Sequence, residues 1–295
     1  MTKWFEKNGP DGDVVISTRI RFARNLKTLP FPCKLKQSDR EKVNEQVIDA
    51  VLNGNMALSS RFKVIDIKAI PKYEAISLVE KHIISPQFAS DNNNSRKLLL
   101  LDDNSVSIMI NEEDHIRLQV MREGLNFDDA YDTADKLDTF LDEKLSFAFD
   151  DRLGYLTQCP TNLGTGMRAS LQLHLPALED SGAMDRISLS LSKLGLTLRG
   201  FYGEGTKPKG SMYQLSNQVT LGLSEKLAIN NLRDIAMQLI KQERAARYSI
   251  AKEIEFLDVI GRSYGILLNC RTLSNEEFLK LISNVRLGVS INEIK

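Results

Sequence analysis

The chain has 295 residues, of which 42% are hydrophobic and 26% charged, as is usual for a soluble globular protein of one large or two modest domains. Thirty-nine basic residues balance thirty-nine acidic ones, which argues against general binding to nucleic acid or to a membrane surface. Three widely separated cysteines, no signal-peptide core and no apolar run of ~20 residues predict a cytoplasmic protein without disulfides.

In the first half of the chain, apolar periodicity and turn signals predict strands and helices in irregular order. Residues 38–41 read Ser-Asp-Arg-Glu, a capping-box pattern that predicts a helix ending near Gly54. The turn Asp102-Asp103-Asn104 predicts a hairpin between strands over residues 97–101 and 106–110. The other expected elements are strands over residues 14–22, 63–70 and 115–120, a helix over 73–82 and a polar loop over 91–95.

In the second half, the apolar spacing becomes mainly helical. A long helix over residues 224–247 should face the core with Leu227, Leu232, Ile235, Leu239 and Ile240. The other expected elements are helices over residues 128–145 and 187–194, strands over 168–175 and 196–199, and a helix capped by Ser274. Strands interleaved irregularly with helices favour an α+β sheet covered on one side, not a doubly wound fold.

Four of the predicted strands place arginine on their polar face. Side chains alternate along a strand, so these residues lie opposite the apolar face that each strand offers to a core. Guanidinium is a planar cation with five donors, so five of them on one face predict a site for an anion with many oxygens, such as a nucleotide triphosphate. The alternative is a solvated face paired with surface carboxylates, which any one strand alone would favour. The arginines are Arg19, Arg21, Arg117, Arg168 and Arg199, and Ser17 and His115 share their faces.

Three further segments carry candidate chemistry. Glu112, Glu113 and Asp114 precede Arg117, where a general base or a ligand of magnesium-bound water would be needed; otherwise they form a solvated turn. The glycine-punctuated segment 159–168 offers backbone amides to phosphate but is not a Walker A loop. Its Cys159 is either a core thiol or a thiolate beside cations. Residues 203–210 predict a flap, whose Glu204 is a second carboxylate or only loop polarity.

Three blocks of this sequence resemble the signature motifs of the phosphagen (guanidino) kinases. They are Ser-Thr-Arg-Ile-Arg at 17–21, Asn-Glu-Glu-Asp-His-Ile-Arg at 111–117, and Cys-Pro-Thr-Asn-Leu-Gly-Thr-Gly-Met-Arg-Ala-Ser at 159–170. Segments 8–17, 199–205 and 213–218 are most similar to the bacterial protein arginine kinases (McsB type). The resemblance covers roughly residues 8–290.

This resemblance implies a magnesium-ATP site on a large antiparallel β-sheet flanked by helices. It implies a catalytic domain at residues 1–250 and a helical C-terminal segment at 251–295, shortened relative to the family. By motif position the five arginines would hold the phosphates, and Ser17 and His115 would belong to the same nucleotide site. Glu113 would orient and deprotonate the acceptor guanidinium, with Glu204 as the second carboxylate and Cys159 beside the same group. Glu112 would be a further catalytic residue. We expect no protein ligands for a resident metal.

The resemblance also implies phosphorylation of arginine side chains in proteins, which marks them for degradation or serves stress regulation. A zinc-binding activator protein and a Clp-type unfoldase are the implied partners, and a homodimer is one possible assembly. Few residues precede the first strand, so the lid domain of small-molecule phosphagen kinases is missing, which favours a protein-borne acceptor. The alternatives are a kinase of free arginine or another small guanidine, and an inactive ATP-binding adaptor for a protease.

Overall fold

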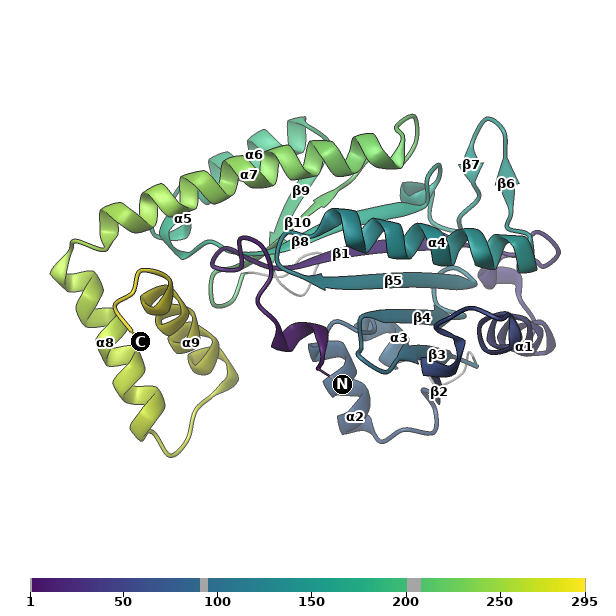
Figure 1. The fold of residues 1–295 in the computed structure, drawn as a ribbon, viewed down its shortest axis with the longest axis horizontal. Helices are drawn as coiled ribbons and strands as arrows, with labels where there is room; N and C mark the ends of the chain where they lie inside the picture. The colour runs from purple at the N-terminus through teal and green to yellow at the C-terminus, as the bar shows by residue number, and fades with distance from the viewer. Residues whose placement is uncertain (1, 91–94, 201–207, 295) are drawn as a thin grey trace.

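An eight-stranded sheet forms the centre of the computed structural model, which describes residues 2–90, 95–200 and 208–294 (Figure 1). The strand order is β2-β3-β4-β5-β1-β8-β10-β9, and every neighbouring pair is antiparallel. The predicted α+β fold with a large antiparallel sheet is confirmed. The strands are β1 (Val15–Arg24), β2 (Phe62–Asp66), β3 (Lys97–Leu101), β4 (Val106–Ile110), β5 (Ile116–Glu123), β8 (Met167–His174), β9 (Leu196–Gly200) and β10 (Met212–Asn217), with a separate hairpin of β6 (Phe149–Asp150) and β7 (Gly154–Tyr155).

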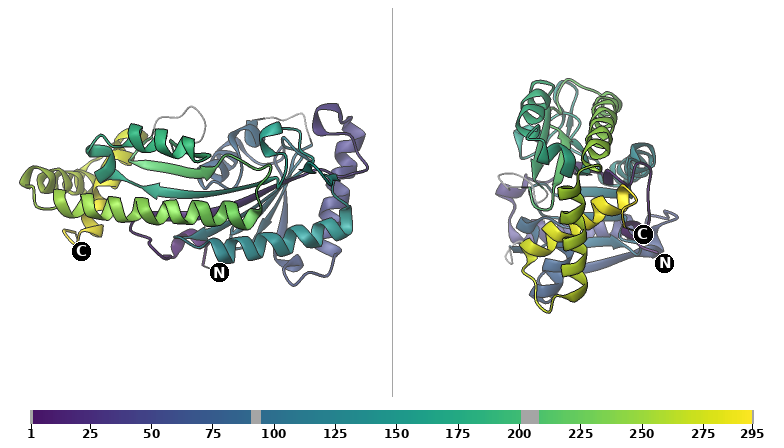
Figure 2. Two further views of the ribbon diagram at one scale, coloured as in Figure 1. Left: turned by 90° about the horizontal axis from the view of Figure 1, so that it is seen from above. Right: turned by 90° about the vertical axis from the view of Figure 1, so that its left-hand side faces the viewer.

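Helices flank this sheet, and the two longest ones lie along the same side of it (Figure 2). Of these, α4 packs on β1 and β5, and α7 packs on β8 and β10. The segment expected to be a helical C-terminus folds as α8 and α9, which pack on each other beyond the end of α7 (Figure 1). The helices are α1 (Gln37–Asn53), α2 (Lys72–Glu80), α3 (Pro86–Ser90), α4 (Phe127–Leu145), α5 (Pro176–Asp180), α6 (Met184–Lys193), α7 (Glu225–Ile250), α8 (Ile254–Asn269) and α9 (Asn275–Ser290). Among the helices described, none has the length and apolarity that a membrane span requires.

The sheet separates two hydrophobic cores, because strand side chains alternate between its faces. On β3, Leu99 and Leu101 join the main core under α1, α4 and α7, whereas Leu98 and Leu100 join a second core. This second core also contains Phe88 of α3 and covers the opposite face under α2 and α3. The expectation that only one side of the sheet is covered is therefore wrong at the β2-β3-β4 end, because β3 and β4 contribute apolar side chains from both of their faces.

Two details of the predicted helices are wrong, and both concern helix starts. Helix α1 begins at Gln37 with the extended Lys36 as its N-cap, so Ser38 lies inside the first turn and caps nothing. In α7, Leu227 is 46% exposed, and the next two residues, Ala228 and Ile229, are the ones buried at this end of the helix. By contrast, the predicted cap of the last helix is confirmed, since the Ser274 side chain accepts a hydrogen bond from the Glu277 amide.

A fully buried arginine joins the sheet to its helices at the end of β1. Arg24 is 1% exposed, and its Nη2 lies 2.7 Å from Asp138 Oδ2 on α4. Its Nη1 donates to the Thr165 carbonyl at 2.9 Å, and its guanidinium lies 3.5 Å from the centre of the Tyr155 ring. The segment that leads into β8 is thus held against α4 and the β6-β7 hairpin by one cation.

Replacing Asp138 with alanine should destabilise the fold strongly, because it leaves the buried Arg24 with only the more distant carboxylate of Glu225, 4.0 Å away. Breaking a buried pair in this way costs about 3–5 kcal/mol in free energy of unfolding. The matched control is Asp132→Ala on the same helix, which removes only an exposed pair with Lys136 and should cost less than about 1 kcal/mol. Urea unfolding of both variants measures the difference, and equal losses would contradict the structural role given to Arg24.

Candidate functional site

The strand register brings the five predicted arginines into one pocket. Arg21 of β1 lies directly opposite Arg168 of β8, and Ala23 lies opposite Arg117 of β5. Arg199 lies on β9, which is separated from β8 by β10, and its cross-strand partner on β10 is Gln214. The pocket has a volume of about 210 Å³ and is lined by Arg19, Arg21, Arg117, Arg168 and Arg199. Residues that are up to 180 positions apart in the sequence thus share one surface.

These guanidinium groups destabilise one another. The pKa of Arg19 is lowered to about 10, mainly by burial and further by the positive charges of Arg117 and Arg168. Burial, together with the charges of Arg19, Arg117 and Arg168, lowers the pKa of Arg21 well below its usual value. The pKa of Arg168 is also lowered, by burial and by the charges of Arg199 and Arg117. Like charges that face each other across strands destabilise a sheet. A polyanion in the pocket would reverse this effect.

Hydrogen bonding divides the arginines into two groups. Arg19 is held by protein groups, because its Nε donates to Ser170 Oγ at 3.2 Å and its Nη2 to Gln214 Oε1 at 2.7 Å. Arg21 and Arg168 form no salt bridge within the described residues, and the Nε atom of each is buried without a hydrogen-bond partner there. Buried polar groups in native proteins are nearly always satisfied, so these two donors point to a ligand.

Part of the lining of the pocket is less charged than the rest. It consists of Val79, His82, Ile84 and Met109, which come from α2, the segment after it and β4. Burial, followed by the charges of Arg19 and Arg21, lowers the pKa of His82 to about 3, so its imidazole is neutral at pH 7. This part of the lining suits an uncharged, flat or apolar group. The sequence did not point to His82, because the α2 segment showed only helical periodicity.

A second pocket of about 190 Å³ adjoins the first and contains the predicted acceptor groups. Glu113 and Cys159 both line it, and the two pockets share Arg21, Arg117 and Arg168. The side chain of Glu113 is 39% exposed and lies 3.1 Å from Arg117 Nη2. Two groups, one bound in each pocket, would therefore lie next to each other at the three shared arginines.

Arg117 connects the carboxylates to the cationic pocket. Its Nη1 lies 2.7 Å from Glu112 Oε2, while its other terminal nitrogen contacts Glu113. Glu112 is nearly buried, also accepts a hydrogen bond from Ser85 Oγ at 2.6 Å, and lines neither pocket. It pairs with Arg117, and its expected catalytic role at the acceptor stays a prediction.

Three other predicted site residues lie outside the two pockets or outside the described chain. His115 is fully buried, with Nδ1 accepting from the Leu26 amide at 3.0 Å and Nε2 2.9 Å from the Pro30 carbonyl oxygen. Both ring nitrogens of His115 thus contact backbone, and its expected role at the nucleotide site stays a prediction. Ser17 lies beneath the arginines, 3.4 Å from Gln172 Oε1. Glu204 and most of the predicted flap fall at residues 201–207, outside the described residues.

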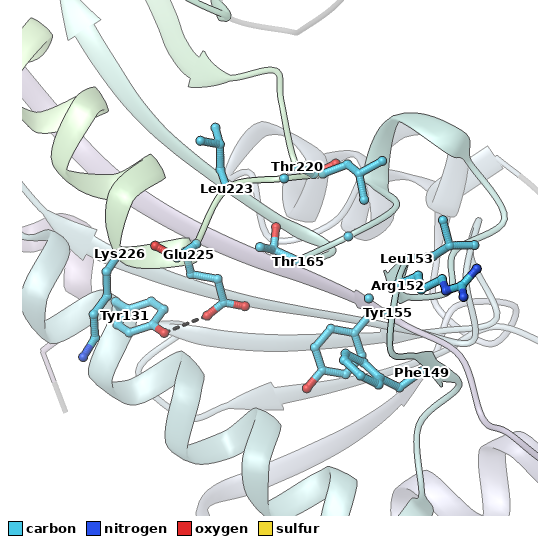
Figure 3. A pocket seen from close by; sticks show the side chains of 15 residues that line it. Tyr131, Phe149, Arg152, Leu153, Tyr155, Thr165, Thr220, Leu223, Glu225 and Lys226 are labelled. Carbon is cyan, nitrogen blue, oxygen red and sulfur yellow. Dashed lines mark hydrogen bonds between the residues drawn. The ribbon is translucent and has the colours of Figure 1, made fainter.

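A third hollow, on the helix side of the sheet, has a different character (Figure 3). It has a volume of about 530 Å³ and lies between the β6-β7 hairpin and the start of α7. Tyr131 donates to Glu225 there at 2.6 Å, and Phe149 and Tyr155 form part of its wall (Figure 3). It contains none of the five arginines, so it is not the polyanion site.

The chain matches two family models. Residues 42–246 match the ATP:guanido phosphotransferase C-terminal catalytic domain, and residues 253–295 match the C-terminal domain of protein-arginine kinase McsB. Among curated relatives, the protein-arginine kinase of Caldanaerobacter subterraneus subsp. tengcongensis is 46% identical, over 95% of this chain and 83% of that protein. The protein-arginine kinase of Halothermothrix orenii is also 46% identical, over 100% of this chain and 84% of that protein.

Solved structures of guanidino kinases share the fold. The duplicated taurocyamine kinase from Schistosoma mansoni with bound transition state analog components has a TM-score of 0.72 and 29% identity, covering 80% of this chain and 34% of that one. Lombricine kinase has a TM-score of 0.71 and 26% identity, covering 82% of this chain and 69% of that one. The matched models, the full-length relatives and the arginine-lined sheet agree: the chain belongs to the ATP:guanido phosphotransferase family, and within it to the protein-arginine kinases.

Proposed function

We propose that this protein transfers the γ-phosphoryl group of ATP to arginine side chains of other proteins. The observation that carries the proposal is the pair Arg21 and Arg168, which lie on adjacent strands with unsatisfied buried donors where the two pockets meet. Phosphoryl transfer depends mainly on positioning and on neutralising the phosphate oxygens. Two guanidinium groups that have no salt bridge to a carboxylate among the described residues support that chemistry.

In the proposed complex, the base of ATP occupies the part of the first pocket near His82 and Met109, and the phosphates extend toward Arg21 and Arg168. Within the described residues no group of three or more His, Cys, Asp or Glu side chains could hold a metal ion. Mg²⁺ usually keeps several waters and binds the phosphates of the substrate, so this arrangement suits an ion that enters with the nucleotide. Bound there, it would neutralise charge on the phosphate oxygens.

The acceptor guanidinium would lie in the second pocket beside Glu113 and Cys159. As its nitrogen bonds to the γ-phosphorus, the bond from that phosphorus to the bridging oxygen breaks and ADP leaves. The proton lost by the guanidinium passes to the Glu113 carboxylate, since a protonated guanidinium is a poor nucleophile. Glu204 remains the proposed second carboxylate, by its position in the family motif.

The likeness to relatives named protein-arginine kinase, along nearly the whole chain, supports a protein-borne arginine over a free guanidine. The match of residues 253–295 to the C-terminal domain of that group supports it as well. We further propose that the modification marks its targets for degradation or stress regulation, with a zinc-binding activator and a Clp-type unfoldase as partners.

The direct test supplies labelled ATP with equal concentrations of arginine in free form and in an unfolded basic protein. We expect label on the protein, in a phosphoramidate bond that survives alkali and is lost in acid. Mass spectrometry should then locate phosphoarginine. Label that appears mainly on free arginine would support the small-guanidine kinase, and absence of transfer together with normal ATP binding would support the adaptor.

Replacing Glu113 with glutamine should lower turnover by ~10²–10⁴-fold, because the acceptor loses its general base. ATP affinity should change little, since Glu113 lines only the second pocket. Initial rates and nucleotide titration measure the two effects separately. Near-normal turnover in this variant would remove Glu113 from the mechanism.

Replacing Arg168 with alanine should weaken ATP binding roughly 10- to 100-fold, the equivalent of the ~1.5–3 kcal/mol of a charge-assisted hydrogen bond. The melting temperature of the protein without nucleotide should not fall, because the substitution relieves repulsion from Arg199 and Arg117. The control is Arg233→Ala on α7, which removes a surface pair with Asp128. A similar loss of ATP affinity in both variants would contradict the phosphate-binding role of Arg168.

A further inference from the structure

Asp114 is a buried carboxylate that lines neither pocket but connects the elements around the second one. It is 1% exposed, and a single oxygen, Oδ1, accepts two hydrogen bonds. One comes from Nδ2 of Asn25 at 2.7 Å, and the other comes from the backbone amide of Gln158, also at 2.7 Å. The strand β1 has just ended at Asn25, whereas Gln158 belongs to the loop that leads toward β8.

Both bonded segments lead directly to groups of the second pocket. Glu113 is the residue before Asp114, and Cys159 is the residue after Gln158. Asn25 completes the connection, because its Oδ1 accepts from the His115 amide at 2.9 Å and its Nδ2 also lies 3.1 Å from the Leu156 carbonyl oxygen. The turn with Glu113, the loop with Cys159 and the end of β1 are therefore joined at one side chain.

The second oxygen of Asp114 distinguishes this contact from ordinary core packing. Oδ2 is buried and has no hydrogen-bond partner among the described residues. Burial raises the pKa of Asp114, although the hydrogen bonds from Gln158 and Asn25 act in the opposite direction. A buried carboxylate with one unsatisfied oxygen lowers the free energy of unfolding, so stability alone does not account for Asp114. A positional requirement would explain it.

We propose that Asp114 is a positioning residue that sets Glu113 and Cys159 at the spacing needed for phosphoryl transfer. The inference rests on the proposed function, and it adds a role for a residue that contacts no reacting group. Glu113 and Cys159 both lie on loop segments, outside the hydrogen-bond ladder of the sheet. Without the Oδ1 contacts, each could shift on its own, and misplacements of about 1 Å can cost ~10²-fold in rate.

The kinetic test compares two substitutions of Asp114. Asp114→Ala removes both hydrogen bonds and should lower kcat by ~10²-fold while leaving ATP affinity unchanged. Asp114→Asn keeps an oxygen at the Oδ1 position, so it should restore kcat to within about tenfold of wild type. Equal losses in both variants would mean that the charge itself takes part in the reaction, and wild-type kcat in Asp114→Ala would mean that no positioning occurs. Either result overturns the proposal.

A second measurement reports on the loop without any turnover, so it still decides the question if arginine phosphorylation is not found. The alkylation rate of Cys159 is compared by mass spectrometry with that of the exposed Cys270 in the same molecule. The ratio should change several-fold in Asp114→Ala and stay near wild type in Asp114→Asn. Ser283→Ala, which removes a different buried hydrogen bond to His174, should leave the ratio unchanged. An unchanged ratio in Asp114→Ala, with ATP binding intact, overturns the proposal.

Discussion

Mutual repulsion among arginines on one face of a sheet is the constraint on which this structure depends. Arg21 and Arg168 lie opposite each other on neighbouring strands, and both have lowered pKa values because of burial and the surrounding cations. Their backbone is held by an antiparallel ladder that does not depend on the side chains. The opposite face of the same strands contributes Ile20, Phe22 and Ala169 to the main core, which supplies the free energy that this arrangement consumes.

The chain contains two kinds of arginine with buried guanidinium nitrogens, and the difference separates support from function. Arg24 and Arg247 are each paired with a buried or nearly buried carboxylate, Asp138 and Glu243, at 2.7 Å. Arg21 and Arg168 have no such carboxylate among the described residues. A paired arginine holds elements together, whereas an arginine with unsatisfied donors is prepared for an anion that comes from outside. The two kinds occur on one strand, where Arg21 and Arg24 point to opposite faces.

The two pockets differ in how rigidly the fold holds them. The cationic pocket is built on β1, β5, β8 and β9, so its geometry follows from the sheet. The acceptor groups Glu113 and Cys159 lie on connecting segments, which usually move more than strands do. The fold compensates with contacts that cross between segments, of which the Asp114 bonds to Asn25 and Gln158 are the clearest. Precise placement on loops thus depends on a few buried polar groups.

The sequence alone determined most of the strands and the faces that carry arginine, because period-two alternation is a local property of the chain. It missed β10, and the strand that it predicted over residues 63–70 ends at Asp66. It predicted the β3-β4 hairpin to the residue, since turn chemistry and strand pairing act there over a few positions. It also indicated Glu113 and Cys159, through motifs whose spacing resembles that of the family. These features require no knowledge of distant contacts.

Only the tertiary structure decided which of these residues have partners. Arg24 and Asp138 are 114 positions apart, and no local pattern pairs them. His115 follows the same alternation as Arg117, but its ring nitrogens contact backbone atoms. The sequence pattern of Asp114 is that of an ordinary turn residue, and only the structure shows its hydrogen bonds with Gln158 and Asn25. A hydrogen-bond partner depends on strand register and helix packing across the whole chain, so the roles of polar residues emerge only when the fold has formed.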